Sequence, residues 1–209
     1  MKLYGDSESG NCYKIKLLLA HLGRPYQWVD IDILAGESRS EDFLAKNPNG
    51  KIPVLELADG SHLAESNAIL YYLSEGTAYL PEQPLNRARA LQWLFFEQYS
   101  HEPFIATSRF WIHYLDARDE YAEKLAERRE PGYRALRVME QTLENHPFLV
   151  ADRFTIADIA LFAYTHVAPE GDFELEGFPA IRAWIERISA LPGHLPMRQP
   201  SPKPLSDNH

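Results

Sequence analysis

The chain has 209 residues, of which 45% are hydrophobic and 24% charged, which is ordinary for a soluble globular protein of one large or two small domains. Its formal net charge of -9 argues against nucleic acid or an anionic membrane as its main partner. The single cysteine cannot form an internal disulfide. No stretch approaches the ~20 apolar residues of a membrane span, and none at the start is typical of a signal peptide. We therefore expect a reducing, cytoplasmic location.

The first third of the chain alternates strand and helix signals in the order β-α-β-α-β-β-α. The expected strands are residues 2–4, 26–33, 52–57 and 62–64, and the expected helices are 15–22, 38–46 and 68–73. A helix between the first two strands predicts that they pair in parallel. Asp59-Gly60 predicts an antiparallel hairpin for the last two strands. We expect Ser66 to cap the last helix.

The rest of the chain has helical periodicity. The expected helices are residues 86–114, with a soft break at Pro103, and 120–144, 155–167 and 179–191. A proline-containing linker, residues 76–85, separates them from the first part. The predicted organisation is an α/β domain over residues 1–75, an all-helical domain over 86–195, and a proline-rich tail over 196–209 that lies extended on the surface.

The turn before the first helix holds four residues that can do chemistry: Ser7, Ser9, Asn11 and Cys12. Hydroxyls and thiols are activated at helix N-termini, although each of these residues could also be a simple cap or turn residue. Redox proteins with a C-x-x-C motif have their nucleophile at the first cysteine, and that position holds Ser9 here. Cys12 is therefore predicted to be a packed or half-buried thiol, with a redox role as the alternative.

Two further segments have both a structural and a functional interpretation. Pro53 either starts a strand or forms a cis peptide bond, which would leave the backbone of Ile52 to pair with an extended ligand. Ser66 either caps a helix or holds a carboxylate at the helix N-terminus, with Glu65 placed to hold an ammonium group. An α-amino acid head group needs both of those contacts.

Four segments resemble, in order and spacing, those of cytosolic glutathione S-transferases. They read SGNCYKIKLLL, NPNGKIPVLE, LAESNAILYYL and FLVADRFTIADIALFAY. The resemblance covers about residues 1–192 and is to bacterial, theta- or nu-like members of the serine type. It implies a thioredoxin-like N-terminal domain (α/β) followed by an all-helical C-terminal domain, a homodimer, and glutathione as co-substrate bound mainly by the first domain.

The resemblance also implies roles for single residues near the sulfur of glutathione. Ser9 matches the serine, threonine or cysteine that meets the sulfur in theta-, nu- and omega-like classes. Asn11 matches an asparagine that faces the sulfur in nu-like members. We expect Ser9 to be the principal contact and Asn11 its rival. Thr155 and Asp158 match the capping motif of the family and are interpreted as a folding element.

The remaining contacts that the resemblance implies follow the ligand from end to end. Lys51 would lie near the glycine carboxylate, and the backbone of Ile52, before a cis Pro53, would pair with the cysteinyl part. Glu65 and Ser66 would hold the γ-glutamyl head group.

The second substrate is expected to lie against aromatic helices. Phe104, Ser108 and Trp111 share one helical face by their spacing, and Tyr164 lies on the helix after the capping motif. These side chains could equally be core. Arg109 stands in an apolar-aromatic run, where it could attract an acidic substrate or pair with a neighbour.

The predicted function is a glutathione transferase that conjugates glutathione to a hydrophobic electrophile, as in detoxification. A glutathione-dependent disulfide-bond reductase is the first alternative, and a non-catalytic interaction protein of the same fold is the second. The 8 histidines show no metal-ligand spacing, so no metal is expected.

Overall fold

The computed structural model describes residues 1–198 and divides into two compact units. The first unit contains Met1–Leu73 together with the described residues from Pro192 onward, and the second is Ser74–Leu191. The predicted linker, 76–85, therefore falls within the second unit, and residues 192–195 group with the first unit. Of the predicted tail, residues 199–209 lie outside the described residues.

The first unit is built on a four-stranded sheet in the order β2-β1-β3-β4. The strands are β1 Lys2–Gly5, β2 Gln27–Asp30, β3 Val54–Glu56 and β4 His62–Ala64. β1 pairs in parallel with β2 and antiparallel with β3, and β3 pairs antiparallel with β4, as predicted. The paired Leu3 and Leu55 are fully buried, so the centre of the sheet belongs to the core.

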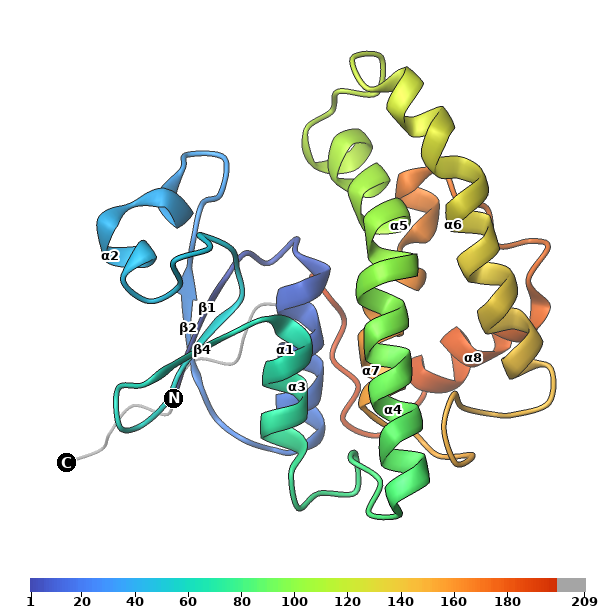
Figure 1. The fold of residues 1–209 in the computed structure, drawn as a ribbon, viewed down its shortest axis with the longest axis horizontal. Coiled ribbons are helices and arrows are strands. Elements are labelled where there is room, and N and C mark those ends of the chain that lie inside the picture. Colours follow the sequence, from blue (N-terminus) through green and yellow to red (C-terminus); the bar gives the residue numbers. More distant parts are fainter. Residues whose placement is uncertain (199–209) are drawn as a thin grey trace. The chain divides into compact units, whose positions relative to one another are not determined.

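Helices cover both faces of this sheet (Figure 1). Figure 1 shows α1 and α3 on one face and α2 on the other. The helical segments are α1 Gly10–His21, the 3-10 helix η1 Glu37–Arg39, α2 Glu41–Leu44 and α3 Ser66–Ser74. This arrangement is the predicted thioredoxin-like one. Most of α1 is buried, and the buried positions include Lys14 and Lys16.

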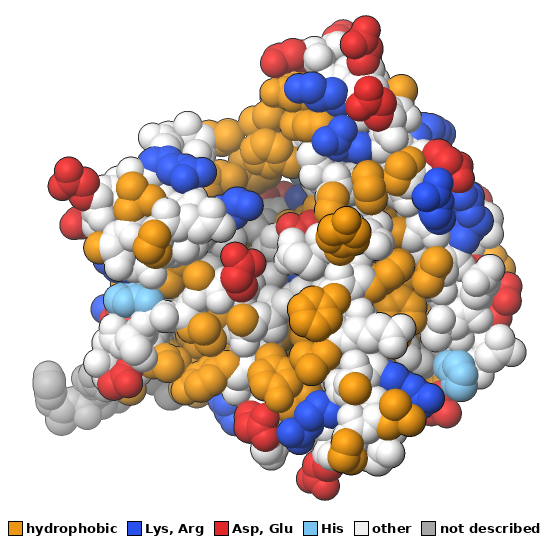
Figure 2. All heavy atoms as spheres, in the orientation of Figure 1, with side chains coloured by type: hydrophobic (Ala, Val, Ile, Leu, Met, Phe, Trp, Pro, Cys, Tyr) orange, Lys and Arg blue, Asp and Glu red, His pale blue; other side chains and the backbone are white. Residues whose placement is uncertain are grey.

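The second unit is helical, as predicted. Its segments are α4 Pro84–Phe96, η2 Glu97–His101, α5 Glu102–Arg109, η3 Phe110–Tyr114, α6 Ala122–Leu143, α7 Ile156–Thr165, η4 Ala168–Gly171 and α8 Pro179–Ser189. Every residue of α7 is buried, which makes this helix the centre of the unit. Hydrophobic side chains gather over the α4–α5 part of the face shown in Figure 2.

The predicted helix 86–114 contains two widened turns, η2 and η3, which are π-helical. The N–H of Glu102 donates to the carbonyl of Glu97, and the N–H of Leu115 donates to that of Phe110, five residues earlier in each case. The first widened turn ends just before Pro103, which has no N–H to continue a regular ladder. The predicted break is therefore a local widening that starts before the proline.

A capping box starts α7. Thr155 Oγ1 accepts from the backbone N–H of Ala157, and a carboxylate oxygen of Asp158 accepts from the backbone N–H of Thr155 at 2.9 Å. The other oxygen of Asp158 accepts from Leu149 N–H at 2.9 Å and from Trp184 Nε1 at 3.0 Å. Burial raises the pKa of Asp158 to about 6, and these donors act in the opposite direction. The predicted folding element is confirmed.

Candidate functional site

The site predicted for a sulfur atom is the turn between β1 and α1, where Ser9 is the N-cap residue. Ser9 Oγ accepts from the backbone N–H of Cys12 at 3.4 Å, and the Ser9 N–H donates to the carbonyl of Asp6 at 3.1 Å. No acidic side chain lies in the first turn of α1, so the positive end of the helix dipole is not neutralised from within that turn. Because the oxygen of Ser9 accepts from the helix, its hydroxyl proton can be donated to an anion.

Cys12 lies in the same turn but its thiol faces the interior. The side chain is fully buried, and a Cβ added to Gly5 would lie 2.6 Å from its sulfur. Burial raises the pKa of Cys12 to about 12, against a smaller opposite effect of the hydrogen bond with Ser9. The thiol is therefore protonated at neutral pH. The prediction of a packed thiol is confirmed.

Asn11 and Ser66 connect the N-termini of α1 and α3. The hydroxyl of Ser66 donates to Asn11 Oδ1 at 3.0 Å and accepts from the ammonium of Lys14 at 3.3 Å. Lys14 also donates to Asn67 Oδ1 at 3.4 Å. The structure thus connects Asn11, the second candidate for the sulfur contact, to Ser66, which is predicted to bind the head group. The sequence analysis missed Lys14, whose partners are 52 and 53 positions away in the chain.

The prediction that Ser66 caps a helix starting at residue 68 is wrong. Helix α3 begins at Ser66 itself. The hydroxyl of Ser66 is engaged with Asn11 and Lys14, which lie on another helix. Glu65 precedes the helix with φ 67°, a left-handed conformation that is uncommon outside glycine and is often found at functional sites. Its side chain is exposed, as binding of an ammonium group requires.

The peptide bond between Ile52 and Pro53 is cis, which is one of the two readings of this segment. Pro53 is buried and leads directly into β3, whereas Lys51 is exposed. The carbonyl of Lys51 accepts from Asn47 Nδ2 at 2.7 Å, and Asn47 Oδ1 accepts from the N–H of Asn49 at 3.1 Å. The buried amide of Asn47 therefore organises the loop before Pro53, a role that the sequence analysis did not assign.

The residues predicted for the second substrate lie on three elements of the second unit. Phe104, Ser108 and Arg109 are on α5, Trp111 is on η3, and Tyr164 is on α7. The hydroxyl of Ser108 donates to the carbonyl of Phe104 at 2.8 Å. The ring of Tyr164 is buried.

Two of these residues have partners within the second unit. Arg109, which is 3% exposed, pairs with Glu170 at 2.7 Å. Of the two alternatives given for Arg109, the structure shows the pairing with a neighbour. Trp111 stacks on Tyr121 with ring centroids 4.5 Å apart, and the guanidinium of Arg128 lies 4.4 Å from the Trp111 ring. The widened turn η3 starts between Ser108 and Trp111, so a regular helical phase does not relate them.

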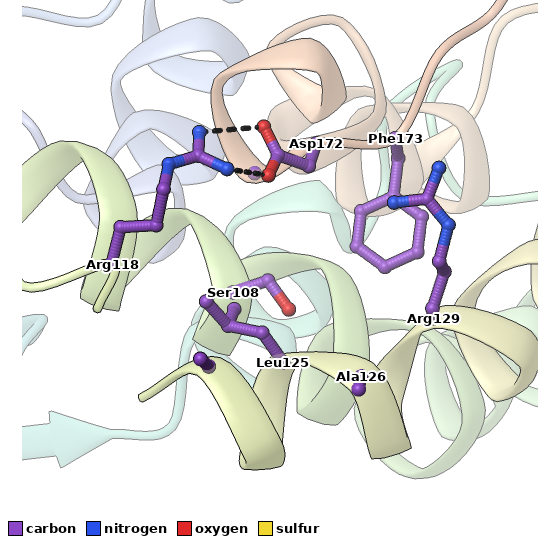
Figure 3. Close-up of a pocket in the computed structure, with 9 residues that line it drawn as sticks. Ser108, Arg118, Leu125, Ala126, Arg129, Asp172 and Phe173 are labelled. Atoms are coloured by element: carbon purple, nitrogen blue, oxygen red, sulfur yellow. Dashed lines mark hydrogen bonds and ion pairs between the residues drawn. The ribbon is translucent and has the colours of Figure 1, made fainter. Parts of the chain in front are cut away.

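A pocket of 280 Å³ lies between α5, α6 and the segment after η4 (Figure 3). Its lining residues are Ser108, Arg118, Ala122, Leu125, Ala126, Arg129, Gly171, Asp172 and Phe173. Figure 3 shows Arg118 paired with Asp172 at one side and Arg129 at the other. Ser108 is the one predicted second-substrate residue that lines this pocket.

Comparison with known proteins identifies the family. The family model for the glutathione S-transferase N-terminal domain matches residues 1–75, and that for the C-terminal domain matches residues 91–192. The crystal structure of a glutathione S-transferase from Pseudomonas fluorescens is 55% identical, with a TM-score of 0.93 over 95% of this chain and 98% of that chain. The chain belongs to the glutathione S-transferase family. The predicted family and fold class are thereby confirmed.

Two other relatives are similar over most of the chain. The disulfide-bond oxidoreductase YfcG of Escherichia coli is 32% identical over 87% of each chain. A glutathione transferase from Phanerochaete chrysosporium, solved with oxidized glutathione, is 25% identical. It has a TM-score of 0.82 and covers 92% of this chain and 90% of that chain.

Two features are absent from residues 1–198. No group of three or more His, Cys, Asp or Glu side chains there is arranged to hold a metal ion. No helix in the same range has both the length and the apolar character needed to cross a membrane.

Proposed function

We propose that the chain is a glutathione transferase that binds glutathione on its thioredoxin-like domain, stabilises the thiolate and conjugates it to an electrophilic small molecule. The observation that carries the proposal is the 3.0 Å hydrogen bond between Ser66 Oγ and Asn11 Oδ1. This bond connects the N-termini of α1 and α3. The N-terminus of α1 is predicted to contact the sulfur, and that of α3 is predicted to bind the γ-glutamyl head group. The thiolate and the α-carboxylate of the head group are both anionic, and helix N-termini favour anions.

The chemistry that the protein must supply is ionisation of a thiol. A free thiol with a pKa near 8.5 is only a few per cent ionised at pH 7. Lowering that pKa by about two requires roughly 2.7 kcal/mol of preferential stabilisation of the thiolate. A hydrogen bond from the Ser9 hydroxyl and the dipole of α1 are together of this size. The thiolate then attacks the electrophilic carbon, forming a C–S bond as the leaving group departs with its electron pair.

The roles of the other residues follow the length of glutathione. Lys51 is the partner of the glycine carboxylate, and the backbone of Ile52, held by Pro53, pairs with the cysteinyl part. Glu65 accepts from the ammonium of the γ-glutamyl group, and Ser66 binds its carboxylate. The electrophile contacts residues of the helical domain drawn from Phe104, Ser108, Trp111 and Tyr164, and Arg109 is left out because it is buried and paired with Glu170. The exposed Lys51 and Glu65 support this assignment because both are open to a ligand.

The test of Ser9 is a comparison of three alanine variants with an aryl halide as electrophile. We expect Ser9→Ala to lower kcat/KM about 10- to 100-fold and to raise the pKa of bound glutathione, since one donor to the thiolate is lost. Asn11→Ala should have a smaller effect. Ser7→Ala is the matched control, because Ser7 is an exposed serine of the same turn and should behave as the wild type. Full activity of Ser9→Ala would remove Ser9 from this role.

A second candidate function is glutathione-dependent reduction of disulfides, which the relative YfcG and the position of Asn11 favour. The thiolate of bound glutathione attacks a mixed disulfide, R–S–S–G, to form oxidized glutathione and release R–S⁻, which takes a proton from water. Cys12 is too deeply buried to serve as the protein's own redox thiol. Turnover with a mixed glutathione disulfide, for wild type, Asn11→Ala and Cys12→Ala, separates this function from conjugation. No binding of glutathione at millimolar concentration would leave the non-catalytic alternative.

A homodimer is part of the proposal. Phe95 and Tyr99 are 72% and 85% exposed, and they lie one widened turn apart on α4 and η2. Large aromatic side chains exposed in this way are typical of protein interfaces. We expect a mass of two chains by light scattering, and a lower dimer fraction for Phe95→Ser with Tyr99→Ser. A monomeric wild type at micromolar concentration would contradict the dimer.

We also propose a cytoplasmic location and a role in detoxification. The chain's one thiol is free, which suits a reducing compartment. Conjugation to glutathione makes an apolar electrophile soluble and unreactive, and this is the chemical basis for proposing a role in detoxification.

A further inference from the structure

Lys14 is a fully buried lysine on the face of α1 that meets α3. Figure 1 shows these two helices side by side on one face of the sheet. Removing an ammonium group from water costs several kcal/mol, so a lysine is almost never fully buried unless it is paired. The contacts of Lys14 lie at the N-terminus of α3, 3.3 Å from Ser66 Oγ and 3.4 Å from Asn67 Oδ1.

We propose that Lys14 is a positioning residue that makes the Ser66 hydroxyl a hydrogen-bond donor toward the glutathione site. The inference rests on the proposed function and assigns to that site a residue that does not itself touch the ligand.

The direction of each hydrogen bond follows from the chemistry of the groups. An ammonium group has three donors and no acceptor, so Ser66 Oγ must accept from Lys14. The single proton of Ser66 then points away from Lys14, and it is donated to Asn11 Oδ1 at 3.0 Å. Because the side-chain oxygen of Asn11 accepts this proton, the group that Asn11 can direct toward a ligand is its NH₂ donor.

With Lys14 donating to Ser66 and Ser66 donating to Asn11, both Ser66 and Asn11 can offer hydrogen-bond donors to an anionic ligand. A carboxylate has acceptors only, so a serine that can only donate outward can bind either of its oxygens, whereas a neutral amide offers one acceptor oxygen and an NH₂ group for which this serine has no acceptor. Because Ser66 has one proton, a bound carboxylate competes with Asn11 for it. Occupancy of the head-group site is therefore linked to the orientation of Asn11 in the turn that faces the sulfur.

The first test measures affinity for glutathione and for an analogue whose γ-glutamyl α-carboxylate is an amide. We expect wild type to prefer the carboxylate at least about 100-fold, and Lys14→Met to reduce that preference to about 10-fold or less, because Ser66 can then turn and accept. Lys14→Arg keeps a group that only donates and should retain the preference. An unchanged preference in Lys14→Met, with folding verified by circular dichroism, would overturn the inference.

The second test asks whether Lys14 acts through Ser66. We expect Lys14→Met to weaken glutathione binding about 10-fold in the wild-type background and by less than about twofold in Ser66→Ala. Equal loss in both backgrounds would overturn the assignment and leave the proposed function intact. Absence of glutathione binding by the wild type would overturn both.

The matched control is Lys16→Met, which removes the other buried lysine of α1. Lys16 is 1% exposed, donates to the carbonyl of Met197 at 3.3 Å and lies 5.2 Å from the Trp28 ring. These contacts lead to Met197 and Trp28 and not to the N-terminus of α3, so the preference for the carboxylate should be that of wild type. A loss in Lys16→Met equal to that in Lys14→Met would mean that both report general damage to α1, and would overturn the assignment.

Discussion

Cys12 is the one thiol of the chain, and its surroundings make it unreactive. The thiolate is the nucleophile, and a pKa of about 12 leaves only roughly one part in 10⁵ ionised at pH 7. We expect the native protein to react with an aryl disulfide reagent at least about 100-fold more slowly than the protein unfolded in urea. Absorbance of the released thiol gives both rates.

The same burial predicts what Cys12→Ala does. Turnover with either class of substrate should stay within about twofold of wild type, because the thiol does not reach the ligand. The free energy of unfolding should fall by about 1–2 kcal/mol, since the sulfur packs against Gly5. Loss of disulfide reduction alone in this variant would contradict the prediction and restore a redox role for Cys12.

At the residue scale, sequence patterns pointed to the turn before α1, to Pro53 and to Ser66, but they did not point to Lys14 or Asn47. The spacing of Ser9 and Cys12, and the residue types at Pro53 and Ser66, are local signals that the chain carries in short segments. Lys14 carries no such signal, because a lysine on a helix is expected in solvent and its buried partners come from a distant helix. Asn47 was missed because the sequence analysis interpreted this loop through Pro53 alone.

At the element scale, the carboxylate of Asp158 ties α7 to two other segments. It accepts from Thr155, Leu149 and Trp184 in the interior of the helical unit. We expect Asp158→Ala to lower the free energy of unfolding by about 3–5 kcal/mol, because several buried donors lose their acceptor at once. Thr155→Ala should cost about 1–2 kcal/mol, the usual effect of losing a cap. Urea unfolding followed by tryptophan fluorescence measures both.

The control for Asp158 is Glu123→Ala, which removes an exposed acidic residue from the first turn of α6. That change should cost no more than about 0.5 kcal/mol, since only a surface interaction with the helix dipole is lost. Similar losses in Asp158→Ala and Glu123→Ala would show that the buried contacts of Asp158 contribute little.

Helices and strands were predictable where hydrophobic periodicity is strong, and the widened turns were not. The widened turn η2 has a local cause in Pro103, but its start six residues before the proline depends on how the helix packs. The second widened turn, η3, contains no proline or glycine, so nothing in Phe110–Tyr114 distinguishes it from an ordinary helix. The expected common face of Ser108 and Trp111 was lost for that reason.

At the scale of the whole molecule, the chain leaves the first unit near residue 74 and returns to it near residue 192. The returning segment, residues 192–198, packs on α1. The hydroxyl of Tyr13 donates to the carbonyl of Leu195 at 2.7 Å, and Arg198 pairs with Glu8 at 3.3 Å. A proline-rich segment without periodicity gives no sign of such packing, so the sequence predicted only an extended surface tail. The first unit therefore includes residues that are far from its other members in the sequence.

Met197 is the buried anchor of this segment, with 4% of its side chain exposed. We expect Met197→Ser to lower the free energy of unfolding by about 2–4 kcal/mol, because a large apolar side chain is replaced by a small polar one in a packed site. Amide hydrogen exchange should accelerate in peptides covering Gly10–His21, the helix that the segment covers. Leu34→Ser is the matched control, since Leu34 is 59% exposed in the same unit and should change neither measurement. Unchanged protection of α1 in Met197→Ser would show that the N-terminal fold is stable without this segment.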